Sequence, residues 1–324
     1  MIDRPEISVV MSVYNGLRYL PGAIESILVQ QRADFEFIII DDGSTDGSTG
    51  LLEQYASSDR RIRLIKEENR GLTRALIRGC QEAKARFIAR QDADDLSLPQ
   101  RLSKLAEMLR QDQNLAFVSS WADVIGPEDE LLLTYIRPAD PETATHQLMF
   151  ERLGPPGHGS VMFRRDRYEE VGGYRRELFL GQDSDLWLRL GLVGRLGYAQ
   201  EVLYQYRISD SSISSGMNER RMSFIRLIAE LHAARMAGQS EEPILERAKV
   251  VPRGNQPGSN ESKSQALYFI GRLLYNRGDG RARGYFLRCV KNNPMHLKAW
   301  LCLLGTVLPR TKRLGRAADQ GRGA

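Results

Sequence analysis

Cysteine is scarce in this sequence, and its placement excludes two classes of protein. The 324 residues include three cysteines, Cys80, Cys289 and Cys302, which lie far apart and without the spacing of metal ligands. This usage excludes a disulfide framework and a cysteine-based metal site, and it fits a reducing compartment. We therefore expect a cytoplasmic protein.

Long apolar runs are also missing. The N-terminal residues carry charges at Asp3, Arg4 and Glu6 ahead of a short apolar run, a pattern typical of neither a signal peptide nor a membrane span. A later apolar stretch at 299–308 is too short to cross a bilayer. The sequence predicts a protein that is soluble or peripheral on a membrane.

A glycine-rich phosphate loop is absent after the first predicted strand. The segment VMSVYNGLRYL contains one glycine, Gly16, where a dinucleotide-binding fingerprint needs a run of spaced glycines. A P-loop is equally absent. The sequence therefore excludes a nucleotide site of either kind at this turn.

Charge and apolar content are those of an ordinary globular chain. The net charge of +5 comes from Lys and Arg residues spread widely along the sequence, so we expect no nucleic-acid partner. The apolar fraction of 42% is enough for one large core of about 200 to 250 residues with a smaller appendage.

Strand and helix patterns alternate over the first hundred residues. Strands are predicted at 7–13, 35–40, 62–65 and 86–90, and helices at 17–31, 51–57, 73–85 and 99–110. This alternation predicts an α/β fold with a mostly parallel sheet flanked by helices. Ligands of such sheets bind at the carboxyl ends of the strands.

Acidic residues gather at two of these strand ends. Asp41 and Asp42 follow the second predicted strand, in the segment FIIIDDGSTDGST, and Asp92, Asp94 and Asp95 follow the fourth. Two acidic strand ends can converge on one crevice. Their carboxylate oxygens suit ribose hydroxyls, a base edge and a hard cation such as Mg²⁺ or Mn²⁺, so we expect a nucleotide diphosphate brought in with the metal.

The second half of the chain changes character. A hairpin is predicted around Gly126, and the chain becomes mainly helical after about 215, with a linker near 251–262. Residues 265–304 predict two packed helices that resemble a single tetratricopeptide-type repeat. We expect one domain at 5–215 and a helical C-terminal extension at 216–324.

Six ordered segments resemble an inverting family 2 glycosyltransferase of the GT-A fold. They are ISVVMSVYNGLRYLPGAIESILVQQ, FEFIIIDDGSTDGST, NRGLTRALIRGC, RFIARQDADDLSLPQRL, GHGSVMFRRDRYEEVGGY and GQDSDLWLRL. They cover roughly residues 5–210 in the order of the family. One acidic pair alone would carry little weight, because such pairs are usually solvated turns.

The resemblance implies a set of donor-side residues. Residues that line the nucleotide pocket or a loop beside it would be Val13, Tyr14, Asn15, Asn69 and Arg70. Asp42 would accept hydrogen bonds from uracil or ribose, Asp92 would lie near the ribose, and Asp94 would hold the Mg²⁺ or Mn²⁺ on the diphosphate. Asp46 is favoured as a helix N-cap over a ligand contact, whereas Asp95 fits metal contact or a supporting bond equally well.

The resemblance also implies a base and an acceptor side. Asp183 in GQDSDLWLRL would be the general base, with Gln182 where the family usually has Glu. Asp185 would lie in the acceptor pocket or cap the following helix, and the cap is favoured. The segment with His158, Gly159 and Ser160 would lie under the acceptor.

One further segment departs from the family pattern. YQYRISDSSIS resembles the Tyr-Arg-x-His segment that helps relatives to hold the metal or diphosphate, but Ser209 stands at the histidine position. We expect Arg207 to meet the phosphates in its place.

The function that the resemblance implies is transfer of a sugar from a UDP-sugar, with inversion, to a hydroxyl of a glycan or lipid-linked acceptor in cell-surface polysaccharide synthesis. Two alternatives stay open. A sugar nucleotidyltransferase would need a glycine-rich basic loop that is missing here, and a catalytically degenerate scaffold is argued against by the intact Asp42, Asp92, Asp94 and Asp183.

The C-terminal end LPRTKRLGRAADQGRGA carries five basic residues against one acid. A solvated tail explains it, and so does an anchor, because basic residues after an apolar helix can rest on anionic lipid. We expect peripheral binding to the inner face of the cell membrane.

Overall fold

A computed structural model describes residues 5–208, 219–251 and 260–306. Residues 5–208 and 219–251 form one compact unit, and 260–306 belong to a second. The predicted linker at 251–262 lies largely outside the described residues, as do Ser209 and the basic C-terminal end. The division into domains at 215 stays a prediction.

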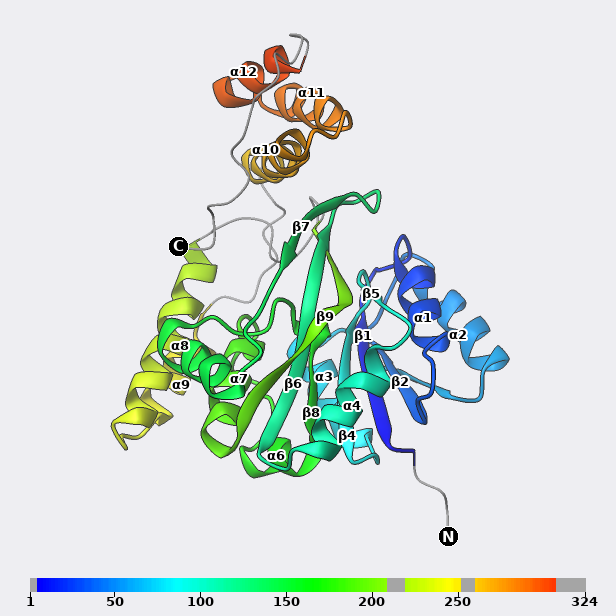
Figure 1. Cartoon of the computed structure of the whole chain (residues 1–324), viewed down its shortest axis with the longest axis vertical. Helices are drawn as coiled ribbons and strands as arrows, with labels where there is room; N and C mark the ends of the chain where they lie inside the picture. Colours follow the sequence, from blue (N-terminus) through cyan, green and yellow to red (C-terminus); the bar gives the residue numbers. More distant parts are fainter. Residues whose placement is uncertain (1–4, 209–218, 252–259, 307–324) are drawn as a thin grey trace. The chain divides into compact units, whose positions relative to one another are not determined.

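The first half of the sheet is parallel, as the alternating pattern predicts (Figure 1). Its strands run in the order β3-β2-β1-β4, with bounds β1 (Ile7–Val13), β2 (Phe35–Asp41), β3 (Ile62–Lys66) and β4 (Phe87–Asp92). Helices α1 (Leu20–Leu28), α2 (Ser48–Ser58) and α3 (Leu72–Glu82) connect them. Val13 pairs with Asp41 and Ser12 pairs with Asp92, so the end of β1 lies between the two acidic strand ends.

The second half of the sheet is mixed. The order continues from β4 through β8 (Met162–Arg164), β6 (Leu115–Ile125) and β9 (Arg195–Arg207) to the short β5 (Leu96–Ser97). β6 and β9 pair in parallel, while β8 is antiparallel to both of its neighbours. β7 (Leu131–Tyr135) pairs with β6, and the Gly126 N–H donates to the Glu130 carbonyl at 2.8 Å, which confirms the predicted hairpin.

Apolar cores cover both faces of the sheet. Along β1, Val10 packs with α3, whereas Val9 and Met11 pack with α1 and α4 (Arg101–Gln111), because successive strand residues point to opposite faces. A strand buried on both faces needs apolar residues at successive positions, which explains the unbroken run Phe37–Ile40 in β2. Burial of each such side chain stabilises the folded state by about 1.5–3 kcal/mol relative to leaving it exposed.

Later helices complete the first unit. They are α5 (Pro141–His146), α6 (Arg165–Glu170), α7 (Gln182–Val193), α8 (Glu219–Met236) and α9 (Glu242–Lys249). Phe224 and Leu231 of α8 form an apolar cluster with Leu178 and with Ala248 of α9. Both helices therefore pack within the unit that contains the sheet (Figure 1).

The second unit contains three helices in the described residues, α10 (Asn260–Arg277), α11 (Ala282–Asn292) and α12 (Leu297–Gly305). The prediction of two helices is wrong. The chain leaves helical geometry at Asn293, the residue before Pro294, and the residue before a proline is disfavoured in the α region. No helix in the three described ranges is long and apolar enough to cross a bilayer.

Candidate active site

The polar residues after β2 build a rigid turn against the end of β1. The Asn15 carboxamide oxygen accepts the Thr45 N–H at 2.7 Å, and the Asn15 N–H donates to the Ser44 hydroxyl at 3.1 Å. Asn15 has φ 52°, a left-handed conformation that asparagine tolerates. The ring of Tyr14 is half exposed beside this turn, while Val13 is buried.

Two further aspartates fix the same loop. Asp41 accepts the Ser44 N–H at 3.0 Å, and Asp46 accepts the Leu17 N–H at 3.0 Å. The prediction that Asp46 is the N-cap of the next helix is off by one residue, because the N-cap of α2 is Gly47. Asp46 still accepts the N–H of Ser48, the first residue of α2, at 3.0 Å.

Asp42 ties the β2 end to the loop before α3. Its two carboxylate oxygens accept the N–H groups of Arg70 at 2.8 Å and Gly71 at 2.9 Å. The side chain is 2% exposed, and burial raises the pKa of Asp42, although these two bonds oppose the shift. Asn69 and Arg70 are exposed on the loop. A direct contact of Asp42 with a base stays a prediction.

Asp92 is held by a buried arginine. Arg90 is fully buried in β4, and its guanidinium donates to the Asp92 carboxylate and, at 3.1 Å, to the Val10 carbonyl. Arg90 is not among the site residues predicted from the sequence. The spacing of Arg90 and Asp92 could have indicated the contact, because residues two apart in a strand share a face. Arg90 therefore fixes the orientation of the Asp92 carboxylate at the strand end.

Asp95 supports the acidic turn from inside the protein. Its carboxylate accepts the Tyr204 hydroxyl at 2.8 Å and the Arg207 N–H at 2.7 Å, and it is fully buried. Burial, and next the charge of Asp94, raise the pKa of Asp95 well above its usual range. Of the two roles left open by the sequence, this geometry supports the supporting bond.

Asp94 differs from its neighbours because its carboxylate accepts no hydrogen bond from another residue within the described part of the chain. Burial, and next the charge of Asp92, raise the pKa of Asp94 to about 6. The backbone carbonyl of Asp94 accepts Arg207 Nε at 2.8 Å, and Arg207 also bonds the Gly126 carbonyl at 2.9 Å and Asp129 at 2.6 Å. Arg207 thus fixes the turn that presents the Asp94 carboxylate, and its phosphate contact stays a prediction.

The chemistry of Asp92 and Asp94 is compatible with a divalent cation that also binds a diphosphate. No cluster of three or more His, Cys, Asp or Glu side chains suited to a metal occurs in the ranges that the structure describes. Mg²⁺ is commonly held by one or two carboxylates together with substrate phosphates, which needs no such cluster. Asp94, whose carboxylate accepts no hydrogen bond from another described residue, could supply one such carboxylate, and Asp92, two residues earlier and bonded to Arg90, could supply the second. The metal site stays a prediction.

His158 packs edge to face on Trp187 of α7, with ring centroids 5.8 Å apart. Its Nε2 is 2.6 Å from the Tyr174 hydroxyl, and burial, together with the nearby Arg90, lowers the pKa of His158 to about 4. The negative charges of Asp183 and Asp92 oppose that lowering of the pKa of His158. At neutral pH the ring is uncharged.

Gly159 and Ser160 form a buried floor next to His158. A Cβ atom at Gly159 would lie 1.8 Å from the Tyr204 hydroxyl oxygen and 2.9 Å from the Asp92 nitrogen, so only glycine fits. The Ser160 hydroxyl donates to the Gly157 carbonyl at 2.7 Å. Both residues are buried, so neither presents a side chain to solvent, and their place under the acceptor stays a prediction.

Asp183 stands in the first turn of α7. One carboxylate oxygen accepts the Ser184 N–H at 2.8 Å, and the other accepts no bond from a described residue. Preceding it, Gln182 is buried, and its side-chain oxygen has no hydrogen-bond partner in the described residues. One oxygen of the partly exposed Asp183 carboxylate is therefore without a partner among the described residues, and its role as the base stays a prediction.

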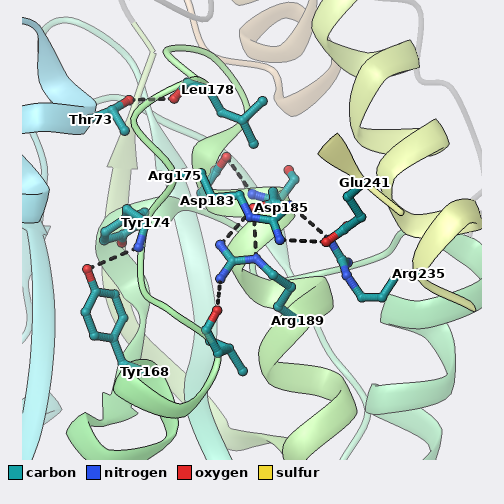
Figure 2. A network of polar contacts seen from close by, with 12 residues as sticks. Thr73, Tyr168, Tyr174, Arg175, Leu178, Asp183, Asp185, Arg189, Arg235 and Glu241 are labelled. Atoms are coloured by element: carbon teal, nitrogen blue, oxygen red, sulfur yellow. Dashed lines mark hydrogen bonds and ion pairs between the residues drawn. The ribbon is translucent and has the colours of Figure 1, made fainter. Parts of the chain in front are cut away.

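Asp185 is buried among arginines (Figure 2). The prediction that it caps α7 is wrong, because the N-cap is Gly181 and no side chain caps this helix. Its carboxylate binds Arg189 at 2.7 Å and Arg235 at 3.2 Å. The contact with Arg235 could not be predicted from local sequence, because Arg235 is 50 residues away.

Arg101 is another buried arginine that the sequence did not indicate. It donates to the carbonyls of Arg90 at 2.6 Å and Gly159 at 2.7 Å, and burial lowers the pKa of Arg101 to about 10. It thereby joins the acidic end of β4 to the floor under His158. An arginine in an amphipathic helix usually faces solvent, so its sequence carries no signal for this role.

Comparisons with known proteins agree with this geometry. The model of the family "Glycosyl transferase family 2" matches residues 8–172. The putative glycosyltransferase EpsE of Bacillus subtilis is 38% identical over 213 residues, covering 64% of this chain and 74% of that protein. The putative teichuronic acid biosynthesis glycosyltransferase TuaG of the same organism is 31% identical, covering 65% and 82%.

Solved structures show the same fold. Residues 1–349 of S. aureus TarS in complex with UDP-GlcNAc superpose with a TM-score of 0.55 at 15% identity, covering 93% of this chain and 91% of that one. The mannosyltransferase PcManGT from Pyrobaculum calidifontis, in complex with GDP-Man and Mn²⁺, gives 0.51 at 18% identity, covering 94% and 86%. Both support the predicted GT-A fold, and from the family match and the close relatives we conclude that this chain belongs to glycosyl transferase family 2 and is a glycosyltransferase.

Proposed function

We propose that this glycosyltransferase moves a sugar from a UDP-sugar to a hydroxyl of a glycan or lipid-linked acceptor, with inversion at the anomeric carbon. TarS is a structural neighbour solved with UDP-GlcNAc, which supports a UDP-sugar donor. TuaG carries teichuronic acid biosynthesis in its name, which supports a product in cell-surface polysaccharide.

One observation carries the mechanism. The His158 ring packs edge to face on Trp187 of α7, the helix whose first turn carries Asp183, with ring centroids 5.8 Å apart. The next residue, Gly159, lies against Asp92, because a Cβ atom there would be 2.9 Å from the Asp92 nitrogen. The helix of the candidate base and the donor-side strand end therefore both contact the segment of His158 and Gly159. A base must reach the hydroxyl that attacks the donor, and geometry therefore ranks above pKa in identifying it. Asp183 has a carboxylate oxygen without a described partner at this place.

In the proposed reaction, Asp183 takes the proton of the acceptor hydroxyl while that oxygen attacks the anomeric carbon and the bond to the diphosphate breaks. A single displacement inverts the configuration and needs no covalent intermediate. Asp94 and Asp92 would hold a divalent cation, which neutralises charge on the leaving diphosphate when it is bound. The uncharged His158 and the turn around Asn15 would line the donor pocket.

The function is tested by donor screening. Purified protein is incubated with UDP- and dTDP-sugars one at a time, and free nucleotide is measured by mass spectrometry. We expect release of UDP from at least one UDP-sugar as water accepts the sugar, and NMR should show the released sugar in the inverted configuration before it mutarotates. Inactivity with every donor would favour the degenerate scaffold, and consumption of a nucleoside triphosphate with a sugar phosphate would favour a nucleotidyltransferase.

We also propose that the C-terminal part of the chain contacts an anionic membrane surface. Charge is strongly asymmetric, because residues 260–306 carry eight Lys and Arg against two acids and residues 307–324 carry five against one, whereas residues 1–259 carry 33 against 38. Helix α12 exposes the apolar side chains of Leu297, Trp300, Leu301 and Leu304. An exposed apolar face beside basic residues suits the interface of an anionic bilayer.

Membrane binding is expected to depend on both features. In flotation with anionic vesicles, the full chain should float at low salt and lose binding at high salt, because each Lys or Arg near the surface contributes up to about 1 kcal/mol. A chain cut after Leu308 should lose most of the binding, and Leu301→Ser should weaken it. Ile136→Ser is the matched control, because Ile136 is 64% exposed and Leu301 70%. Equal partitioning of the cut and full-length chains would contradict the proposed anchor.

A further inference from the structure

A cluster of five ionisable side chains surrounds the buried side of the first turn of α7, the turn that carries Asp183 (Figure 2). It comprises Asp185 and Arg189 of α7, Arg175 of the preceding loop, Arg235 of α8 and Glu241, the N-cap residue of α9. Helices α8 and α9 therefore meet the first turn of α7, about 50 residues earlier in the chain.

Asp185 is the centre of the cluster and is 1% exposed. One carboxylate oxygen accepts Nε and Nη2 of Arg189 at 3.0 and 2.7 Å. The other accepts Nη2 of Arg235 at 3.2 Å and lies 3.7 Å from Nη1 of Arg175. Removing one partner of a buried ion pair leaves an uncompensated charge, so this arrangement opposes displacement of the turn.

Glu241 extends the cluster to α9. Its carboxylate binds Arg175 at 2.7 Å and also binds Arg235, so both arginines bridge Asp185 and Glu241. These bridges connect the first turn of α7 with both helices that follow the sheet. Arg189 completes the network by donating to the Val171 carbonyl at 2.7 Å.

Apolar packing holds the same region. Gly181, the residue before α7, has φ +68°, and a Cβ atom there would lie 2.2 Å from a terminal carbon of Ile228 in α8. The rings of Phe179 and Phe224 meet edge to face with centroids 4.5 Å apart. Helix α8 therefore packs directly on the segment that enters α7.

Asp183 itself is not part of the cluster. It is two residues before Asp185, and residues two apart on a helix point in different directions. The cluster thus holds the turn from one side, while the Asp183 carboxylate bonds only the Ser184 N–H among the described residues.

We propose that Arg235 and Glu241 are positioning residues for Asp183, and that α8 and α9 are required for catalysis although they lie beyond the residues that the family model matches. The inference rests on the proposed function, because it takes Asp183 as the base. These two residues touch no substrate in this account, and they act through the position of the α7 turn.

The test is a double-mutant cycle with kcat and donor KM as readouts. Arg235→Gln should lower kcat by about 10-fold or more, because small displacements of catalytic groups are costly, and it should leave the donor KM unchanged. In the Asp183→Asn background the same change should have no further effect, because the group that it positions is gone. Arg235→Lys keeps the charge and should recover part of kcat.

A matched control comes from the same two helices. Arg247 of α9 and Glu230 of α8 form an exposed ion pair that does not reach α7, so Arg247→Gln should keep the wild-type kcat. Thermal unfolding checks each variant, and Glu241→Gln replaces Arg235→Gln if the latter does not fold.

Two results would overturn the positioning role. The first is that Arg235→Gln lowers kcat by the same factor in the wild-type and the Asp183→Asn backgrounds. The second is that Arg235→Gln raises the donor KM and leaves kcat unchanged. Full activity of Asp183→Asn alone would contradict the base assignment in the proposed function, and this inference with it.

Discussion

Asp183→Asn is expected to lower sugar transfer by about 10²-fold or more, the scale of a lost general base. Donor affinity should be unchanged, because the substitution is nearly isosteric and because the proposed mechanism gives Asp183 no contact with the nucleotide. The amide oxygen can still accept the Ser184 N–H, the bond that the carboxylate makes at 2.8 Å, so the start of α7 is preserved. The loss should therefore appear in kcat.

The measurement is the rate of transfer at saturating donor, with donor affinity taken from a separate titration. Ser184→Ala is the matched control, because Ser184 is an exposed neighbour on the same turn and contributes its backbone N–H, which the substitution keeps. Retention of more than a tenth of the wild-type rate by Asp183→Asn would refute the assignment of the base.

The sheet and its acidic edge were predictable from the sequence for a simple physical reason. Strands buried on both faces require unbroken apolar runs, and the run Phe37–Ile40 is of this kind. The polar residues that follow must then stand at the carboxyl edge. The register places Val13 beside Asp41 and Ser12 beside Asp92, so the two acidic strand ends converge as expected.

The partners of the individual aspartates were not predictable. Asp94 and Asp95 are neighbours in sequence. The buried Asp95 carboxylate accepts the Tyr204 hydroxyl, whereas the Asp94 carboxylate accepts no hydrogen bond from another described residue. The difference depends on β9, which returns to this edge more than 100 residues later. Sequence position cannot distinguish a supporting carboxylate from one available to a ligand when the distinguishing contact is that distant.

The same limit explains the error at Asp185. An aspartate in the first turn of a helix is a common cap, and local reasoning favours that role. Burial beside Arg235 of α8 overrides the capping role, because a buried carboxylate needs cationic partners more than α7 needs a side-chain cap. The buried Arg90 and Arg101 were missed for the same reason, because their partners are carbonyls and carboxylates that only the fold brings close.

Asp94→Asn is expected to abolish most turnover and to weaken UDP binding in Mn²⁺ by about 10- to 100-fold or more, the loss of metal affinity that even a supporting residue can cause. With EDTA present, UDP binding should change little, because the predicted contact of the nucleotide with the turn around Asn15 needs no cation. The carboxylate of Asp94 bonds no other described residue, so removing its charge should not unfold the turn, which Arg207 and Asp95 hold. The contrast between the two titrations therefore isolates the metal.

The control is the same substitution at the opposite edge of the sheet. Asp34 is exposed just before β2, at the amino end of the strand, and Asp34→Asn should leave both UDP titrations at wild-type values. If Asp94→Asn weakened UDP binding equally in Mn²⁺ and in EDTA, the carboxylate would contact the nucleotide or shape its pocket directly. The cation would then have to be held by other groups, and the burial that raises the pKa of Asp94 to about 6 would belong to the pocket rather than to a metal site.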